Sequence, residues 1–495
     1  MQDAIAAIDL GSNSFRLQVG HVVNEQIYAF DRLREPVRLA AGLSPDNWLS
    51  DEACQRGIAA LRLFHERLAG FSPAAVRAVA TNTLRVAKNA GIFLRQAEKA
   101  LGFPIEVIGG REEARLIHLG VVHTLPDPHR QQLIVDIGGG STEFIIGKGF
   151  EPVLLDSLYM GCVGYSLRYF PDGKIGKHGF REAELSSCRE LQSIAHDYRK
   201  LGWDLAVGSS GTARALEEIL VGNGLSAGGI TRDGLEKLRA IFLRAGHLDA
   251  VDLCALDSDR RPVILGGLAI MMAVFRELGL QHMEFSEGAL RLGVLYDLLG
   301  RHCRNDLRDT TVDAFMSRYQ VNMRQAGQVA DTACALFAQI DPAAADPANM
   351  DRRFLRWAAL LHEVGISIAH AGCHKHSAYI LANADMPGFS RVDQARLSRL
   401  VLAHRGRLKR VEEIDPSMPD WLLIVCLRLA VVIHRARDER GVPDVILTRT
   451  RRGFIVTTPP GWLQELPLTA ASFEEERLQW RSVGRALIVR AAQAG

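Results

Sequence analysis

The stretch Leu133–Ile146 reads LIVDIGGGSTEFII, and its pattern predicts a strand, a tight loop and a second strand. Apolar residues lead into Asp136, three glycines form the turn, and Ser141–Glu143 opens a second apolar run. Consecutive glycines let backbone N–H groups converge on an anion, because no Cβ blocks the approach. Carboxylates beside such a cradle would repel the anion unless a hard cation such as Mg²⁺ lay between them. The alternative is an ordinary β-hairpin with a glycine turn.

A related stretch lies near the N-terminus, where Ile5–Leu17 reads IAAIDLGSNSFRL. When Asp9 is aligned with Asp136, 127 residues further on, both copies give Asp, an aliphatic residue, Gly, two small or polar residues and Ser. A phosphate-type loop repeated at domain-sized spacing indicates two similar domains that each offer one loop to a shared cleft. Neither copy is a Walker A loop, which needs Gly-Lys-Ser/Thr, or a dinucleotide fingerprint, whose glycines open a helix.

A third small-residue loop, Gly208–Thr212, follows a predicted strand and precedes a predicted helix. Backbone amides at that helix start could bind another phosphate, although the pattern also fits a plain strand-to-helix turn. The three loops supply the predicted phosphate-binding residues: Gly11, Ser12, Asn13, Ser14, Gly138, Gly139, Gly140, Ser141, Gly208, Ser209, Ser210, Gly211 and Thr212.

Two glutamates, Glu112 and Glu113, follow a double glycine at the start of a predicted helix. One interpretation is favourable charge at a helix N-terminus, which stabilises a helix only slightly. The other is a general base, because hydrolysis of a phosphoanhydride needs a water molecule aimed in line and relieved of its proton.

Arg85 and Lys88 lie on a helix predicted over Thr81–Ala90. Arg85 is a candidate to stabilise the transferring phosphoryl group, whereas Lys88 fits a solvated face.

The composition describes a globular chain of several domains. Its 495 residues suffice for three or four domains, and the net charge of +2 means that any polyanion site must be local. Eight cysteines without a Cys-x-x-Cys pair favour free thiols in a reducing cytosol. Acidic residues Asp3 and Asp9 argue against a signal peptide, and the longest apolar runs, Pro262–Phe275 and Trp421–His434, are too short for a membrane span. We expect a cytoplasmic protein, with peripheral membrane association as the alternative.

The chain divides by pattern into four regions. Residues 1–125 look α/β, and residues 126–305 repeat that layout from the Asp136 hairpin onward. Residues 306–440 read as helices, and residues 441–495 alternate like strands around a Pro-Pro turn. These regions are the predicted domains, the last being a small appended α/β module.

The helical region is rich in histidine. Leu360–Gly365 reads LLHEVG and resembles the His-Asp motif of HD-type metal phosphohydrolases, but Glu363 stands in place of aspartate. No His-Asp pair is present within residues 306–440, and the aspartate such folds place near Val431 is missing. We therefore expect an HD-like helical domain without a metal at His362.

A basic stretch follows the histidines. Seven cations lie between Arg391 and Arg410 against one acid, Asp393. The bland interpretation is a solvated helix face; the alternative is a track for an extended polyanion through Arg405, Arg407, Lys409 and Arg410. No aromatic interleaving or motif supports specific binding of nucleic acid.

Six motifs together resemble the exopolyphosphatase / guanosine pentaphosphate phosphohydrolase family. In chain order they are Asp9–Phe15, Gly110–Ile117, Asp136–Glu143, Met160–Cys162, Gly208–Thr212 and Gly288–Arg291. The resemblance implies an α/β fold with two ribonuclease-H-like domains of the actin/sugar-kinase/heat-shock-ATPase type, the HD-like and C-terminal domains after them, and a homodimer.

The resemblance also implies roles for residues. Glu113 matches the catalytic base, Asp136 and Glu143 match carboxylates associated with Mg²⁺ or Mn²⁺, and Asp9 is added to them as the repeat partner. K⁺ is a further candidate cofactor. Gly138–Ser141 and the segment from His374 favour the exopolyphosphatase branch, which releases orthophosphate from inorganic polyphosphate. Hydrolysis of guanosine pentaphosphate is the alternative, and a non-catalytic polyphosphate- or nucleotide-binding sensor is the alternative of another class.

Overall fold

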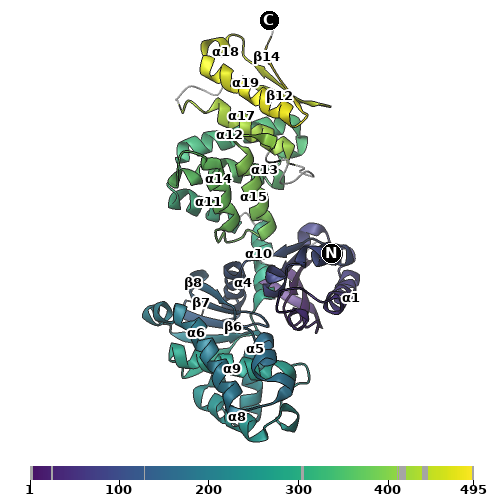
Figure 1. Cartoon of the computed structure of the whole chain (residues 1–495), viewed down its shortest axis with the longest axis vertical. Coiled ribbons are helices and arrows are strands. Elements are labelled where there is room, and N and C mark those ends of the chain that lie inside the picture. The colour runs from purple at the N-terminus through teal and green to yellow at the C-terminus, as the bar shows by residue number, and fades with distance from the viewer. Residues whose placement is uncertain are drawn as a thin grey trace. The chain divides into compact units, whose positions relative to one another are not determined.

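The computed structural model describes residues 4–23, 26–127, 129–302, 306–409, 411, 420–437 and 444–492. The chain divides into two compact units, Met1–Asp306 and Leu307–Gly495 (Figure 1). In the ranges given above, no helix is long and apolar enough to cross a membrane.

The first unit contains two mixed sheets that repeat one arrangement. The order in the first sheet is β3-β2-β1-β4-β5, with bounds β1 Ala4–Leu10, β2 Phe15–Val23, β3 Gln26–Glu35, β4 Val76–Ala80 and β5 Ile105–Val107. The order in the second is β10-β11-β9-β6-β7-β8, with bounds β6 Gln131–Ile137, β7 Thr142–Lys148, β8 Glu151–Leu158, β9 Leu205–Ser209, β10 Ile230–Thr231 and β11 His282–Phe285. Each sheet begins with three antiparallel strands, β1–β3 in the first sheet and β6–β8 in the second. The first strand of each set then pairs in parallel with a later strand: β1 with β4, and β6 with β9. The repeat predicted from the 127-residue offset is confirmed.

The register of the two hairpins places the predicted carboxylates. Asp9 lies opposite Arg16 in the β1–β2 pair, and Asp136 lies opposite Glu143 in the β6–β7 pair. Arg16 and Glu143 are thus the same position in the two copies, with opposite charge. Strand β6 runs between β7 and β9 and is buried on both faces, which explains its unbroken Leu-Ile-Val run.

Helices cover the sheets of the first unit. Their bounds are α1 Asp51–Arg67, α2 Asn82–Val86, α3 Ala90–Leu101, α4 Gly110–Val122, α5 Cys162–Tyr169, α6 Lys177–Leu201, α7 Ser210–Gly222, α8 Arg232–Ala245, α9 Ile264–Leu278 and α10 Leu290–His302. Helices α4 and α10 share one apolar cluster with residues of β1, β4, β6, β7 and β9, so this helix pair is buried against both sheets. Their backbones approach closely, because a Cβ on Gly293 would overlap the carbonyl oxygen of Leu116.

The helix predicted over Thr81–Ala90 is wrong as one element. The structure has the short helix α2, a break, and then α3 from Ala90. The Asn89 amide causes the break: its Oδ1 accepts from the Leu49 N–H at 2.9 Å and its Nδ2 donates to the Leu49 carbonyl at 3.0 Å. Asparagine side chains compete for backbone partners in this way and favour turns over helix interiors.

The second unit is helical up to Arg437 in its described part and then carries strands. The helices are α11 Leu307–Arg318, α12 Met323–Ile340, α13 Met350–Leu361, α14 Cys373–Asn383, α15 Arg391–Ala403, α17 Trp421–Ile433, α18 Trp462–Glu465 and α19 Pro467–Ser482. The strands pair in the order β12-β13-β14, with bounds Ile446–Thr450, Gly453–Thr458 and Ala486–Ala491. Trp480 and Phe454 pack in the same buried cluster as Trp357 and Leu427, so both predicted C-terminal domains share one hydrophobic core.

Candidate active site

The two hairpin loops of the first unit lie against each other. A Cβ on Gly139 would stand 2.9 Å from the Ser12 Cβ, and one on Gly140 would stand 2.5 Å from the Asn82 Oδ1. Behind the second loop, a Cβ on Gly161 would overlap the backbone of Gly139. The glycines are therefore needed for close packing of three segments as well as for presenting backbone N–H groups.

The third predicted loop completes this arrangement. The Ser209 hydroxyl donates to the Asp136 Oδ2 at 2.9 Å, and the Thr212 hydroxyl donates to the Ile137 carbonyl at 2.9 Å. Ser210, the first residue of α7, has a φ of 86°, a conformation that non-glycine residues rarely adopt. Backbone strain of this kind concentrates at functional sites, where the surrounding structure enforces it.

All three loops line one cavity of about 100 Å³. Asp9, Glu113 and Asp136 reach the same cavity from β1, α4 and β6. A volume of this size accommodates a terminal phosphoryl group with an attacking water.

The carboxylates of this cavity are held in an environment that disfavours their negative charge. Burial is the main cause that raises the pKa of Asp136 to about 6, and the charge of Asp9 adds to it. Burial likewise raises the pKa of Asp9, whose Oδ1 is buried without a hydrogen-bond partner. Burial first, then Glu113 and Asp136, raise the pKa of Glu143 well above its ordinary value. A bound cation would relieve each of these penalties.

These residues fit a hard divalent cation. The unpartnered Asp9 oxygen and the Asp136 carboxylate would hold it, while Glu143 lies deeper and accepts a hydrogen bond from the Ser157 hydroxyl at 2.8 Å. Within the described ranges, no three His, Cys, Asp or Glu side chains form a ready metal-binding group. Mg²⁺ usually takes only one or two carboxylates and completes its shell with water and substrate phosphates, so two carboxylates are a sufficient protein contribution.

Glu112 and Glu113 point to different surroundings. Glu112 accepts two hydrogen bonds from Arg115 at 2.8 Å, inside a buried network with Arg77 and Asp297. Glu113 lines the cavity instead, and its Oε2 accepts a hydrogen bond from the Arg85 Nη1 at 3.1 Å. The Glu112 position is therefore structural, and Glu113 alone of the pair can meet a ligand.

Glu113 is poised between its two protonation states at neutral pH. Burial is the largest cause that raises its pKa to about 7, Asp9 and Asp136 raise it further, and Arg85 lowers it. A general base works best with a pKa near the working pH. Arg85 does not line the cavity: it donates to the Ile108 carbonyl at 2.9 Å and stands behind Glu113.

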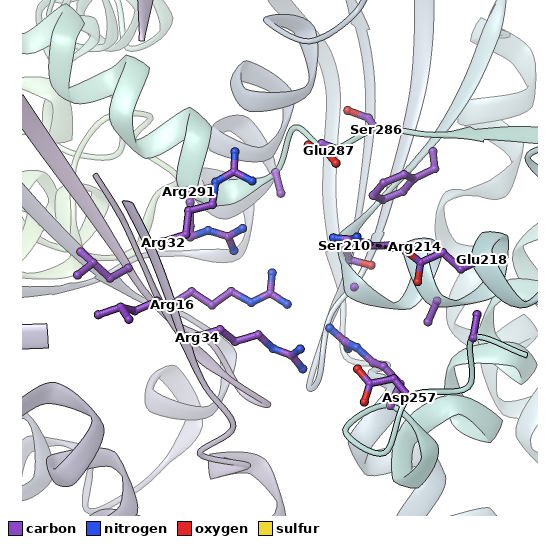
Figure 2. A pocket seen from close by; sticks show the side chains of 18 residues that line it. Arg16, Arg32, Arg34, Ser210, Arg214, Glu218, Asp257, Ser286, Glu287 and Arg291 are labelled. Carbon is purple, nitrogen blue, oxygen red and sulfur yellow. Dashed lines mark hydrogen bonds and ion pairs between the residues drawn. The ribbon is translucent and has the colours of Figure 1, made fainter. Parts of the chain in front are cut away.

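A wider pocket of about 420 Å³ adjoins the carboxylate cavity. Both are lined by Arg16, Arg260 and Arg291, together with Ser210, Gly211 and Ala289. Figure 2 shows Arg16, Arg32 and Arg34 projecting from one side of this pocket toward Ser210 and Arg214 on the other. Sequence reasoning missed these arginines, although Arg16 occupies the hairpin position that corresponds to Glu143.

The arginines of the wider pocket repel one another. Arg16 lies directly opposite Arg34 in the β2–β3 pair, an arrangement of like charges that destabilises a sheet. Burial lowers the pKa of Arg16 to about 9, and Arg291, Arg260 and Arg34 contribute to that decrease. Burial also lowers the pKa of Arg260 and Arg291. A polyanion in the pocket would compensate these charges.

Two family models match this chain, and both describe the same family. A model of the Ppx/GppA phosphatase family matches residues 18–302, and a model of domain III of Ppx/GppA phosphatases matches residues 307–477. The chain belongs to the Ppx/GppA phosphatase family. A guanosine-5′-triphosphate,3′-diphosphate pyrophosphatase from Aeromonas hydrophila is 40% identical over 481 residues, which cover 96% of this chain and 96% of that protein. The resemblance stated from the six motifs is confirmed.

Solved structures of Ppx/GppA type share the fold. An exopolyphosphatase from Cytophaga hutchinsonii gives a TM-score of 0.54 at 22% identity, over 60% of this chain and 97% of that chain. An exopolyphosphatase-like protein gives 0.56 at 24% identity, over 61% and 99%. The Aquifex aeolicus PPX-GPPA enzyme gives 0.50 at 25% identity, over 59% and 99%. The predicted fold class is confirmed.

The predicted polyphosphate track lies in the second unit of this Ppx/GppA phosphatase. Arg405, Arg407 and Lys409 are exposed, and Arg410 lies outside the described residues. Farther back on α15, Arg396 is committed to structure, because its Nη2 donates to the Asp420 carboxylate at 2.6 Å. The track stays a prediction for the three exposed cations.

Proposed function

We propose that this chain hydrolyses the terminal 5′-phosphoanhydride bond of guanosine pentaphosphate, releasing orthophosphate and leaving guanosine tetraphosphate. The sequence motifs favoured inorganic polyphosphate as the substrate, with this nucleotide as the alternative. The Aeromonas relative, at 40% identity over nearly the whole chain, favours the second substrate. The observation that carries the proposal is the wide arginine pocket that opens from the carboxylate cavity.

The carboxylate cavity and the wider arginine pocket match the two parts of such a substrate. The cavity of about 100 Å³ takes the terminal phosphoryl group, and the pocket of about 420 Å³ takes the nucleoside and its 3′-diphosphate. Arginine is the side chain best suited to phosphate, since its guanidinium offers several N–H donors in one plane. Arg16, Arg32 and Arg34 would face the 3′-diphosphate from the β2–β3 hairpin (Figure 2).

The opposite wall offers contacts for a base. Phe285 supplies an aromatic ring, and Glu287 supplies a carboxylate that has no hydrogen-bond partner among the described residues. Guanine presents two neighbouring N–H donors that a carboxylate can accept, whereas adenine presents no such pair. A carboxylate on this wall also repels an extended polyphosphate chain, so Glu287 would favour the nucleotide on both counts.

The chemistry follows from the position of Glu113. Arg85 occupies Oε2, which leaves Oε1 to accept a proton from water. The water oxygen forms a bond to the terminal phosphorus, the bond from that phosphorus to the bridging oxygen breaks, and the 5′-diphosphate leaves with the electron pair. Backbone N–H groups of the three loops orient the phosphates, and Arg16, Arg260 and Arg291 offset their charge. Mg²⁺ held by Asp9 and Asp136 would neutralise charge that develops on the phosphoryl oxygens.

Steady-state phosphate release tests this proposal. The kcat/KM for guanosine pentaphosphate should exceed that for long-chain polyphosphate and for GTP, measured with Mg²⁺ at the same ionic strength. The variant Glu113→Gln controls for contaminating phosphatases, since it keeps size and hydrogen bonding but accepts no proton. A larger kcat/KM for polyphosphate would assign the chain to the exopolyphosphatase branch. Tight binding of either substrate without turnover would make the chain a sensor.

A further inference from the structure

The second unit has a partly open cavity of about 490 Å³ that the proposed function does not use. Its walls come from the ends of α13 and α15, from α14 and α17, and from α19. Sites for small molecules usually measure about 300–1,000 Å³. Four histidines of the helical region line it: His362, His370, His374 and His404.

The imidazoles of His362 and His404 line one side of this cavity, called its floor below, and the two rings are held by equivalent hydrogen bonds. His362 directly follows α13 and His404 directly follows α15. The Nδ1 of each ring bonds a carbonyl oxygen of its own helix at 2.6 Å, that of Ala359 or Val401. A carbonyl accepts only, so each Nδ1 carries the proton and each Nε2 presents a lone pair.

The surroundings keep both rings neutral. Burial is the first cause that lowers the pKa of His362, although Glu363 raises it, and burial lowers the pKa of His404 well below its ordinary value. His374 is the third ring of the row, and the charges of His362, His374 and Arg428 also disfavour a proton on His404. The floor therefore offers acceptors for hydrogen bonds at neutral pH.

A buried arginine fixes the floor in place. Arg428 is 2% exposed, and its Nε and Nη2 donate to the two Glu476 oxygens at 2.6 and 2.7 Å. Its Nη1 donates to the carbonyl of Ala403 at 2.6 Å, the last residue of α15. The residue after that carbonyl is His404, so the ion pair holds the imidazole in position.

Positive charge remains at the cavity after its internal ion pairs are formed. Arg428 pairs with Glu476, and Arg437 pairs with Glu363. Over the residues that the structure describes, Arg405 has no carboxylate partner, and Arg435 donates only to the Ser472 hydroxyl at 2.8 Å. Glu475 is the lining carboxylate left outside these pairs, so two guanidinium groups face one acid.

We propose that this cavity binds a phosphate ester of nucleotide size, with the phosphate on Arg405 and Arg435 and hydroxyl or N–H donors on the Nε2 atoms of His362 and His404. Guanidinium groups recognise phosphate, and neutral imidazole nitrogens accept from the sugar or base. The volume accommodates both parts of such a molecule. This site is independent of the proposed function, because it shares no residue with the first unit.

A metal ion fits the cavity less well than an organic ligand. Throughout the described part of the chain, no three candidate ligands stand in metal-binding geometry. The Glu363 carboxylate lies 3.8 Å from the His362 Nε2 and is engaged by Arg437. His374 also lines the cavity, but among the described residues it does not complete a metal-binding group with His362 and His404, so a zinc site would be incomplete.

Histidine-selective ¹⁵N NMR of the full-length protein tests the proposal with GMP as the probe. The signals of His362 and His404 are assigned through His362→Gln and His404→Gln. Saturation with GMP should move both Nε2 signals, and glucose 6-phosphate should do the same where guanosine does not. Unmoved signals with both phosphate esters would overturn the proposal, as would equal shifts with guanosine.

A matched pair of arginine variants gives the second readout. Arg405 lines the cavity and Arg407 does not, although both are exposed cations of the same segment. Losing one charge-assisted contact should weaken GMP binding at this site about tenfold in Arg405→Gln, with little change in Arg407→Gln. Equal weakening in both variants would indicate general charge attraction and overturn the proposal. Stoichiometric Zn²⁺ binding that moves the two signals, without an effect of GMP, would replace it by a metal site.

Discussion

Arg85 and Glu113 allow a sharp test of how the base is tuned. Arg85 donates to Glu113 at 3.1 Å from behind, and its charge lowers the pKa of a carboxylate that burial raises to about 7. Replacing Arg85 by Met removes that charge, so the pKa of Glu113 must rise. Because the base acts only when deprotonated, the rising limb of activity should move to higher pH.

The size of the shift follows from the hydrogen bond that is lost. A hydrogen bond to a charged group contributes about 1.5–3 kcal/mol, which corresponds to about one to two pKa units. The deprotonated fraction at pH 7 then falls from about one half to between about 1% and 10%, a rate loss of about five- to fiftyfold. A cation bound beside Asp9 and Asp136 lowers the pKa of Glu113 in wild type and variant alike. The rate loss at pH 7 then becomes smaller, while the shift between the two pH profiles remains.

The assay is the pH dependence of kcat/KM between pH 5.5 and 9.5 at saturating Mg²⁺. Arg85→Met should regain at least about half of the wild-type rate near pH 9, and Arg85→Lys should shift the rising limb less because it keeps a positive charge. Lys88→Met is the matched control, since Lys88 is an exposed cation two residues beyond α2. Thermal melts of each variant show whether the lost Ile108 contact affects folding.

A pH-independent rate loss would refute this reasoning. It would mean that Arg85 contacts the phosphoryl group in the transition state, the role predicted from sequence, and does not act through Glu113. If Arg85→Met neither shifts the pH profile nor changes the rate, Arg85 neither tunes the pKa of Glu113 nor contacts the phosphoryl group.

Three further outcomes follow from the site. Asp136→Asn should raise the Mg²⁺ concentration needed for half-maximal activity and lower kcat, and full activity in excess EDTA would contradict the cation site. Gly161→Ala should destabilise the fold by about 1–3 kcal/mol, because its Cβ would overlap the Gly139 backbone, and a melting temperature equal to wild type would contradict that contact. Glu287→Gln should reduce the preference for guanosine tetraphosphate over its adenine counterpart as a competitive inhibitor and improve hydrolysis of long polyphosphate, whereas an unchanged ratio would place the base elsewhere.

The local sequence pattern was sufficient to predict the two hairpins and their repeat. In each copy an apolar run leads to Asp9 or Asp136 and a turn of small residues follows, and such a pattern depends only on residues close together in the sequence. The break before α3 was not predictable in the same way, because Asn89 takes its partner from Leu49, which is distant in the sequence.

The sequence by itself determined the family, the two carboxylate loops and the presence of a glutamate pair at the start of α4. The family resemblance named Glu113 as the base, but only the tertiary structure gives the physical reason. Neighbouring residues of a helix point about 100° apart, and the pairing of Glu112 with Arg115 leaves Glu113 facing the cavity. The tertiary structure also brought Arg16, Arg260 and Arg291 together, which the sequence could not show because these residues lie far apart in the chain. Arginines that lie on different strands, loops and helices form one pocket only because the register of the β2–β3 pair and the packing of the two sheets of the first unit bring them together.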